Sequence, residues 1–195
     1  SLGNTIYLET GQNPKYKKFK QPIENLVIGV SGIPKNTAGL LRDRRDLALK
    51  AVHIIKQSIT DFDLGSVKPA DLATCLQLLP TKLHPYFYAA VHNHDITQKA
   101  LLEFEKDQLD FCNIGKLMSA HHNILKDYLK LTVPKIDTMI DKVLQTGAFG
   151  AKIVGSGGGG CIVALAQDNT EEIIEALMKA GAKQEPDVAL VGGDI

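Results

Sequence analysis

The stretch KIVGSGGGGCIVAL, residues 152–165, decides how the chain folds near its carboxyl end. β-branched and apolar residues dominate Lys152–Val154 and Cys161–Leu165, so both segments are predicted as strands. Between them lie six residues, of which five are glycine. A two-residue turn is enough to join antiparallel strands. A loop of this length and composition therefore indicates a role beyond the turn, with a flexible glycine turn as the alternative.

The loop between these strands is the candidate cofactor-binding site. Glycine permits backbone conformations that other residues avoid and lets another group approach closely. Consecutive amide N–H groups can then cradle an anion such as a phosphate. We expect this role for the residues of the glycine loop, which are Gly155, Ser156, Gly157, Gly158, Gly159 and Gly160.

Two common phosphate-binding motifs do not explain the glycine loop. A dinucleotide fingerprint has to open a helix after its glycines, whereas Cys161–Leu165 has the composition of a strand. A Walker loop requires Gly-Lys-Ser or Gly-Lys-Thr at its end, and no such sequence follows here. The loop is therefore expected to bind an anion between two strands.

Strands and helices alternate unevenly along the rest of the chain. Leu26–Val30 predicts a buried strand, and Ile6–Leu8 predicts a short strand followed by a lysine-rich loop or hairpin tip. Asn169 or Thr170 caps a final helix, and Val188–Val191 predicts a last strand. Apolar residues at helical spacing predict five further helices, over 37–59, 71–79, 85–105, 109–129 and 134–145, the last with Pro134 in its first turn.

This order of elements predicts an α+β fold. We expect a small, ferredoxin-like antiparallel sheet with helices on one face. A helical bundle is inserted between the early strand and the late strands. Because no repeat, low-complexity tract or linker divides the sequence, residues 1–195 are expected to form one domain.

The composition excludes several classes of partner. Lysine plus arginine equals aspartate plus glutamate at 22 each, so charge favours neither nucleic acid nor an anionic membrane. No apolar run has the length of a membrane span, and no signal peptide opens the chain. Three widely spaced cysteines without a paired motif favour a reducing cytoplasm over a disulfide framework or a zinc site.

The histidines could bind a metal, take part in catalysis or pack in the core. His92 and His94 project to different sides of a helix, so no metal site is expected there. His121 and His122 are adjacent, so only one of them can face the core, and a packed histidine is favoured over a catalytic one. Asp137 is expected on a solvated or helix-pairing face.

The stretch GAFGAKIVGSGGGGC, residues 147–161, resembles the third conserved motif of the GHMP kinases. This superfamily includes galactokinase, homoserine kinase, mevalonate kinase and phosphomevalonate kinase. The resemblance includes the lead-in before the glycines as well as the loop itself. It implies the GHMP kinase C-terminal fold, ATP and Mg²⁺ as cofactors, and phosphoryl transfer to a small-molecule alcohol. In the family this loop lies against the nucleotide phosphates and the substrate.

Different segments of the sequence resemble two different members of the superfamily. Residues 26–37 resemble mevalonate kinase, which implies that Lys35 and Thr37 bind the substrate. Residues 114–137 and the pair Arg44-Arg45 resemble galactokinase. We favour a sugar kinase of the galactokinase kind, with mevalonate kinase as the alternative. A small-molecule-binding domain without catalysis is the alternative of another class.

The resemblance also implies a partner domain. The family's phosphate loop and its catalytic aspartate correspond to no segment of these residues, so the chain is expected to be the C-terminal half of the enzyme. We therefore expect these 195 residues to be inactive by themselves and to need the N-terminal nucleotide-binding domain. A homodimer is a further possibility that the sequence leaves open.

Overall fold

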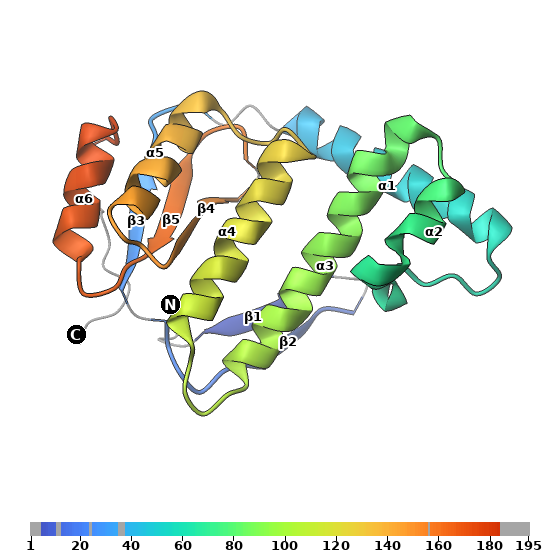
Figure 1. The fold of residues 1–195 in the computed structure, drawn as a ribbon, viewed down its shortest axis with the longest axis horizontal. Coiled ribbons are helices and arrows are strands. Elements are labelled where there is room, and N and C mark those ends of the chain that lie inside the picture. Colours follow the sequence, from blue (N-terminus) through green and yellow to red (C-terminus); the bar gives the residue numbers. More distant parts are fainter. Residues whose placement is uncertain (1–4, 11–12, 24, 35–37, 156, 184–195) are drawn as a thin grey trace.

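The computed structural model describes residues 5–10, 13–23, 25–34, 38–155 and 157–183. Within these ranges it contains five strands and six α-helices (Figure 1), which confirms the α+β class. The elements, in chain order, are β1 (Ile6–Glu9), β2 (Lys15–Lys18), β3 (Leu26–Val30), α1 (Ala38–Ser58), α2 (Leu72–Gln77), α3 (His84–Phe104), α4 (Phe111–Asp127), α5 (Pro134–Gln145), β4 (Gly150–Val154), β5 (Cys161–Leu165) and α6 (Thr170–Lys179).

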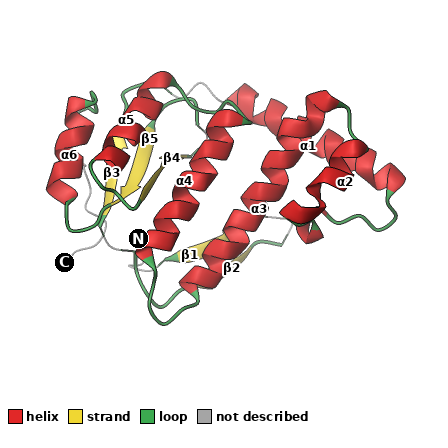
Figure 2. Cartoon of the chain, in the orientation of Figure 1, coloured by secondary structure: helices red, strands yellow, loops and turns green. Residues whose placement is uncertain are grey.

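The central sheet has the strand order β3-β5-β4, and both pairs are antiparallel. Alternate residues of the three strands, such as Val27, Ile153 and Ile162, are fully buried in one apolar core with residues of α5 and α6. Helices α5 and α6 therefore cover one face of this sheet, as the sequence predicts (Figure 2). Burial of each large aliphatic side chain stabilises the fold by about 1.5–3 kcal/mol.

A second apolar core lies in the helical half of the molecule. It joins α1, α2 and the first half of α3 around Ile55, Leu83 and Phe87, which are completely buried. Helix α4 runs beside α3 and separates this half from the sheet (Figure 1). The predicted insertion of a helical bundle between the strands is confirmed.

Helix α4 also packs closely along strand β4. A Cβ atom placed on Gly150 would lie 1.9 Å from the carbonyl oxygen of Gly115, so both positions need glycine. The hydroxyl of Ser119 accepts a hydrogen bond of 3.2 Å from the amide of Ala151. This contact satisfies a donor of β4 at the edge of the sheet and fixes the strand that leads into the glycine loop.

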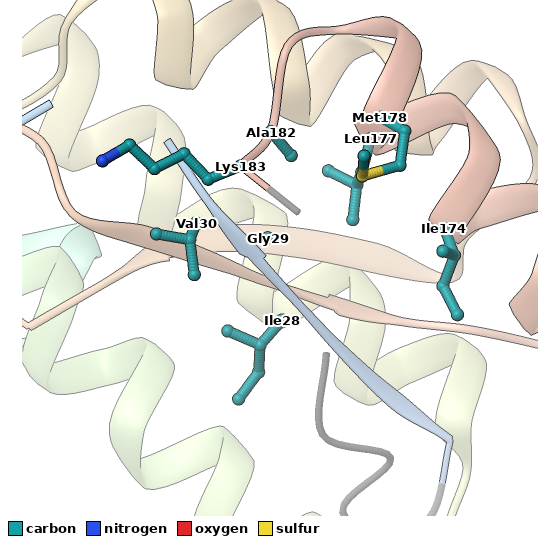
Figure 3. A pocket seen from close by; sticks show the side chains of 8 residues that line it. All are labelled: Ile28, Gly29, Val30, Ile174, Leu177, Met178, Ala182 and Lys183. Atoms are coloured by element: carbon teal, nitrogen blue, oxygen red, sulfur yellow. The ribbon is translucent and has the colours of Figure 1, made fainter. Parts of the chain in front are cut away.

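The opposite edge of the sheet is β3, which has no second neighbouring strand within the described ranges. An apolar groove runs between β3 and α6 (Figure 3). Gly29 permits this approach, because a Cβ there would lie 2.9 Å from a methyl carbon of Leu177. The amide of Lys183 donates to the Val30 carbonyl at 2.8 Å. The predicted strand 188–191 lies outside the described residues.

The β1–β2 hairpin corrects one prediction. The lysine-rich stretch, which was expected to form a loop or a hairpin tip, forms strand β2, and Ile6 pairs with Lys18. The lysine side chains of β2 are exposed, whereas Phe19, directly after the strand, is buried and packs in a tilted arrangement against Phe104 of α3, with ring centroids 5.3 Å apart. Tertiary packing therefore decides the strand against weak local propensity.

The termini of the helices follow local rules in most cases. The carboxylate of Asp110 accepts a 2.9 Å bond from the Asn113 amide and caps α4, and Pro134 opens α5. Asn169 precedes α6 without a side-chain cap bond, and its amide group instead donates to the Thr146 carbonyl at 2.8 Å. None of the helices in the described part is long and apolar enough to cross a membrane.

Candidate functional site

The glycine loop connects β4 to β5. Its described residues, Gly155 and Gly157 to Gly160, all have positive φ angles between 66° and 142°. L-residues with a side chain rarely adopt such angles, so the run of glycines is required by the backbone itself. The structure therefore explains the composition that singled out this loop. Ser156, the remaining candidate, lies outside the described residues.

Backbone hydrogen bonds hold the loop from two sides. The Gly158 amide donates to the carbonyl of Leu131, in the α4–α5 connector, at 2.8 Å. The Gly160 amide donates to the carbonyl of Ile33, after β3, at 3.0 Å. The Gly160 carbonyl in turn accepts from the Ser31 amide at 2.8 Å. The loop is thus clamped between two segments that are distant in sequence.

The same two segments approach the loop too closely for any side chain. A Cβ on Gly157 would lie 2.5 Å from the Leu131 carbonyl oxygen, and a Cβ on Gly159 would lie 2.8 Å from that of Ile33. Both obstacles are backbone atoms, which cannot move away as a flexible side chain could. Gly157 and Gly159 therefore have to be glycine, because any side chain there would collide with the Leu131 or Ile33 backbone.

The clamp also determines which amides remain for a ligand. The N–H groups of Gly158 and Gly160 are used inside the protein, whereas those of Gly157 and Gly159 form no hydrogen bond with other described residues. The sequence suggested a cradle made by all consecutive amides. The structure narrows this candidate set, because alternate amides are already committed.

The segment between β3 and α1 reaches the glycine loop through Ile33 and Pro34. Ser31 is completely buried, and its hydroxyl accepts a 3.1 Å hydrogen bond from the Ile33 amide. This bond holds a turn in which the Ile33 and Pro34 carbonyls face Gly159. The predicted substrate residues Lys35 and Thr37 lie outside the described residues, directly after this turn.

Lys152 is a cation on the strand that leads into the loop. Its side chain is partly buried, and burial lowers the pKa of its amine. Among the described residues it forms no salt bridge. A partly desolvated lysine without an acidic partner provides a favourable position for an anion. Lys152 was part of the sequence motif but not of the predicted site.

His121 on α4 shares this environment. Its pKa is lowered to about 4 by burial, with further contributions from the charges of Lys152 and His122. The imidazole is therefore neutral at neutral pH. It adds no positive charge beside Lys152, although it can still donate or accept one hydrogen bond.

A polar cluster built around the buried side chain of His122 lies between α4 and α5. His122 is 3% exposed, and its Nε2 lies 3.7 Å from an Asp137 carboxylate oxygen, with Lys126 at 3.5 Å from the other oxygen. The hydroxyl of Thr132 donates to Asp137 at 3.4 Å. His122 is therefore the histidine that faces the core, and Asp137 lies on a helix-pairing surface rather than a solvated one.

The remaining histidine pair lies elsewhere. The ring of His92 stacks on Tyr88 with centroids 4.0 Å apart, whereas His94 lines a groove beside residues 65–70. No group of three or more histidine, cysteine, aspartate or glutamate side chains within the described ranges is placed to hold a metal ion.

Sequence reasoning missed the carbonyls of Leu131 and Ile33 as parts of the site. A main-chain contact can be made by almost any residue type, so these positions carry no compositional signal. The glycines that these two carbonyls contact did have such a signal, because a run of glycines is unusual in composition. The missed partners could be found only once the fold had brought residues 33, 131 and 158 together.

Residues 98–183 match the model of a known family, described as GHMP kinases C terminal. The matched range contains α4, α5, the glycine loop with its two strands, and α6. It therefore includes one of the two segments that clamp the loop, the α4–α5 connector. The β3–α1 turn lies before the match.

Individual relatives extend the similarity. The galactokinase of Chloroflexus aurantiacus is 30% identical over 190 residues, which cover 92% of this chain and 48% of that protein. The mevalonate kinase of Thermococcus gammatolerans is 32% identical over 103 residues, covering 53% of this chain and 30% of that protein. The chain thus spans half or less of the length of these curated relatives.

A solved structure shows the same fold. Lactococcus lactis galactokinase complexed with galactose matches with a TM-score of 0.74 at 24% identity. The match covers 85% of this chain and 44% of that one.

Proposed function

We propose that this chain, whose residues 98–183 belong to the GHMP kinase C-terminal family, forms the glycine-loop half of an ATP-dependent sugar kinase. The observation that carries the proposal is the similarity to a galactokinase over 190 residues, which cover 92% of this chain. We propose a sugar hydroxyl as the phosphoryl acceptor. Mevalonate is the second candidate, favoured by the shorter match of 103 residues to a mevalonate kinase.

The residues around the glycine loop suit a phosphate group. The amides of Gly157 and Gly159, which form no hydrogen bond with another described residue, would donate to phosphate oxygens, and the Lys152 amine would supply a positive charge nearby. ATP supplies the phosphoryl group, and Mg²⁺ would neutralise part of its charge. Phosphoryl transfer depends mainly on positioning and charge, and a loop clamped at alternate amides provides a fixed position.

We further propose that a second domain completes the site, as the resemblance to the family implies. The outer face of the β1–β2 hairpin supports this, because Ile6, Leu8 and Tyr16 are between 49% and 69% exposed there. A two-stranded hairpin is marginal alone, and large exposed apolar side chains mark contact surfaces. A cytoplasmic location belongs to the same proposal, since all three cysteines are free.

The test is a coupled assay of ADP formation by the intact gene product, with Mg²⁺ and ATP. Galactose, arabinose, mevalonate and homoserine are supplied separately. We expect turnover with galactose or another sugar. Turnover with mevalonate alone would contradict the sugar assignment, and silence with folded protein across all acceptors would favour a binding domain without catalysis.

The 195-residue chain itself provides a second test. We expect no turnover by the purified chain with any acceptor, since the resemblance assigns the phosphate loop and the catalytic aspartate to the other domain. Circular dichroism has to show that the chain is folded in the same preparation. Measurable turnover above a heat-inactivated control would contradict the need for a second domain.

A further inference from the structure

Arg44 connects three helical segments near the glycine loop. Its Nε donates a 3.0 Å hydrogen bond to the Leu129 carbonyl, just after α4, and one terminal nitrogen bonds the Tyr86 hydroxyl of α3 at 3.2 Å. The guanidinium also lies over the Tyr86 ring, 5.6 Å from its centroid. Arg44 itself belongs to α1. The next residue, Arg45, is exposed.

The carbonyl that Arg44 binds lies in a tightly constrained connector. Leu129 lies two residues beyond the end of α4, so its carbonyl has no partner within the helix, and a cation is favourable close to a helix C-terminus. Lys130 follows with a φ of 53°, an uncommon conformation for a residue with a side chain. The Leu131 amide then returns to the Leu125 carbonyl at 2.9 Å. Arg44 thus holds the connector where its backbone is strained.

The strained connector ends in the clamp of the glycine loop. Two residues after the carbonyl that Arg44 binds, the Leu131 carbonyl accepts the bond from Gly158 and contacts Gly157. At the other end, the Ile33 carbonyl accepts the bond from Gly160, and α1, which carries Arg44, begins at Ala38, four residues after Pro34 in the sequence. Arg44 therefore connects α1 to the arm of the clamp that the α4–α5 connector forms.

We propose that Arg44 is a positioning residue for the nucleotide phosphates. It acts through the Leu129–Leu131 connector, which sets the position of the Gly157 and Gly159 amides. Its role in catalysis rests on the proposed kinase function, whereas its control of the loop does not. Lysine cannot fully reproduce these contacts, because its single nitrogen cannot occupy both positions from which Nε reaches Leu129 and a terminal nitrogen reaches Tyr86.

The first experiment uses the 195-residue chain and needs no activity. Hydrogen exchange is measured by mass spectrometry on peptides that contain Gly157–Gly160, for Arg44→Gln and for the matched control Arg45→Gln. We expect exchange to become roughly tenfold faster in Arg44→Gln, since loss of the Arg44 contacts opens the clamp locally. The control should match the wild type. Equal acceleration in both variants, or none in either, overturns the proposal.

The second experiment separates positioning from general stability in the intact kinase. We expect Arg44→Gln to raise KM for ATP about tenfold, with little change in KM for the acceptor, and Arg44→Lys to recover part of the loss. Tyr86→Phe, which removes only one hydroxyl, should have a smaller effect in the same direction and serves if Arg44→Gln does not fold. A faster exchange without any change in KM for ATP makes Arg44 merely structural and overturns the proposal. Inactivity of the wild type would refute the kinase function and leave the exchange test standing.

Discussion

The two ends of helix α4 are stabilised in different ways. At its start, the buried carboxylate of Glu103 accepts hydrogen bonds from the Asp110 amide at 3.1 Å and from the Asn113 side chain at 2.7 Å. It also pairs with Lys106 at 2.7 Å. All partners lie within ten residues of Glu103 in the sequence. This end is a closed local network.

The far end of α4 depends on distant residues and is incompletely satisfied. Its following carbonyl, from Leu129, needs Arg44, which lies 85 residues away in the sequence. Beneath it, His122 Nδ1 and Asp137 Oδ1 are buried without a hydrogen-bond partner among the described residues. Buried polar atoms without partners are uncommon and concentrate where a protein binds or moves something. The closed end thus anchors the fold, whereas the open end carries the glycine loop.

The largest loss of stability is expected from a substitution midway between the two ends of α4, where the helix packs against β4. Gly150→Ala places its Cβ 1.9 Å from a backbone oxygen that cannot yield. We expect a loss of about 4 kcal/mol or more in unfolding free energy, measured by urea denaturation. Gly39→Ala in α1 is the control, because no atom lies within 4 Å of its added Cβ. A Gly150→Ala chain as stable as the wild type would disprove the close approach.

As pH falls, the protein should lose stability first through His121 and only at lower pH through Glu103 at the start of α4. The pKa of His121 is lowered from 6.5 to about 4, first by burial and then by Lys152 and His122. As pH falls from 6.5 to 4, the unfolded chain binds a proton that the folded chain does not, so stability decreases. The loss is on the order of 3 kcal/mol at most. Burial lowers the pKa of His122 as well, which adds to the same trend.

The start of α4 should withstand this pH range. Hydrogen bonding by Lys106 is the main cause that holds the pKa of Glu103 below its ordinary value of 4.5. Its contribution is present above 4.5 and is lost only as pH falls through the lower folded pKa. His121→Gln should therefore flatten the profile between 6.5 and 4, followed by urea denaturation at each pH. An unchanged profile would show that His121 titrates normally.

The sequence predicted the features that have a local cause better than those that depend on contacts between distant residues. Periodic apolar residues located the helices, and five glycines located the loop, because each pattern has a local physical cause. The β2 strand was missed, since its pairing depends on Phe19 packing against a helix far along the chain. Arg44 was noticed only as part of a resemblance, and its bond to a distant carbonyl has no signature in the sequence.

A smaller loss of stability is expected from substitution of Glu103 at the start of α4. Glu103→Gln keeps the shape of the side chain but removes the charge that three donors share. We expect a loss of about 2 kcal/mol in unfolding free energy, because hydrogen bonds to charged groups are the stronger ones. Glu105→Gln, which alters an exposed pair with Lys17, should change it by less than about 0.5 kcal/mol. Equal effects would mean that the network at the start of α4 does not anchor the helix.

The smallest predicted change in unfolding free energy is a gain rather than a loss. It comes from Lys152, where stability and ligand binding are expected to change in opposite directions. Lys152→Met keeps the length of the side chain and removes a partly desolvated charge, so we expect the protein to become about 1 kcal/mol more stable at neutral pH. The folded pKa of Lys152 lies below 10.5, so the folded amine loses its proton first as pH rises, and the gain should shrink toward 10.5. Under the proposed kinase function, the same change in the intact gene product should raise KM for ATP roughly tenfold. A destabilised Lys152→Met protein would mean that the amine already has a partner and is not held for a phosphate.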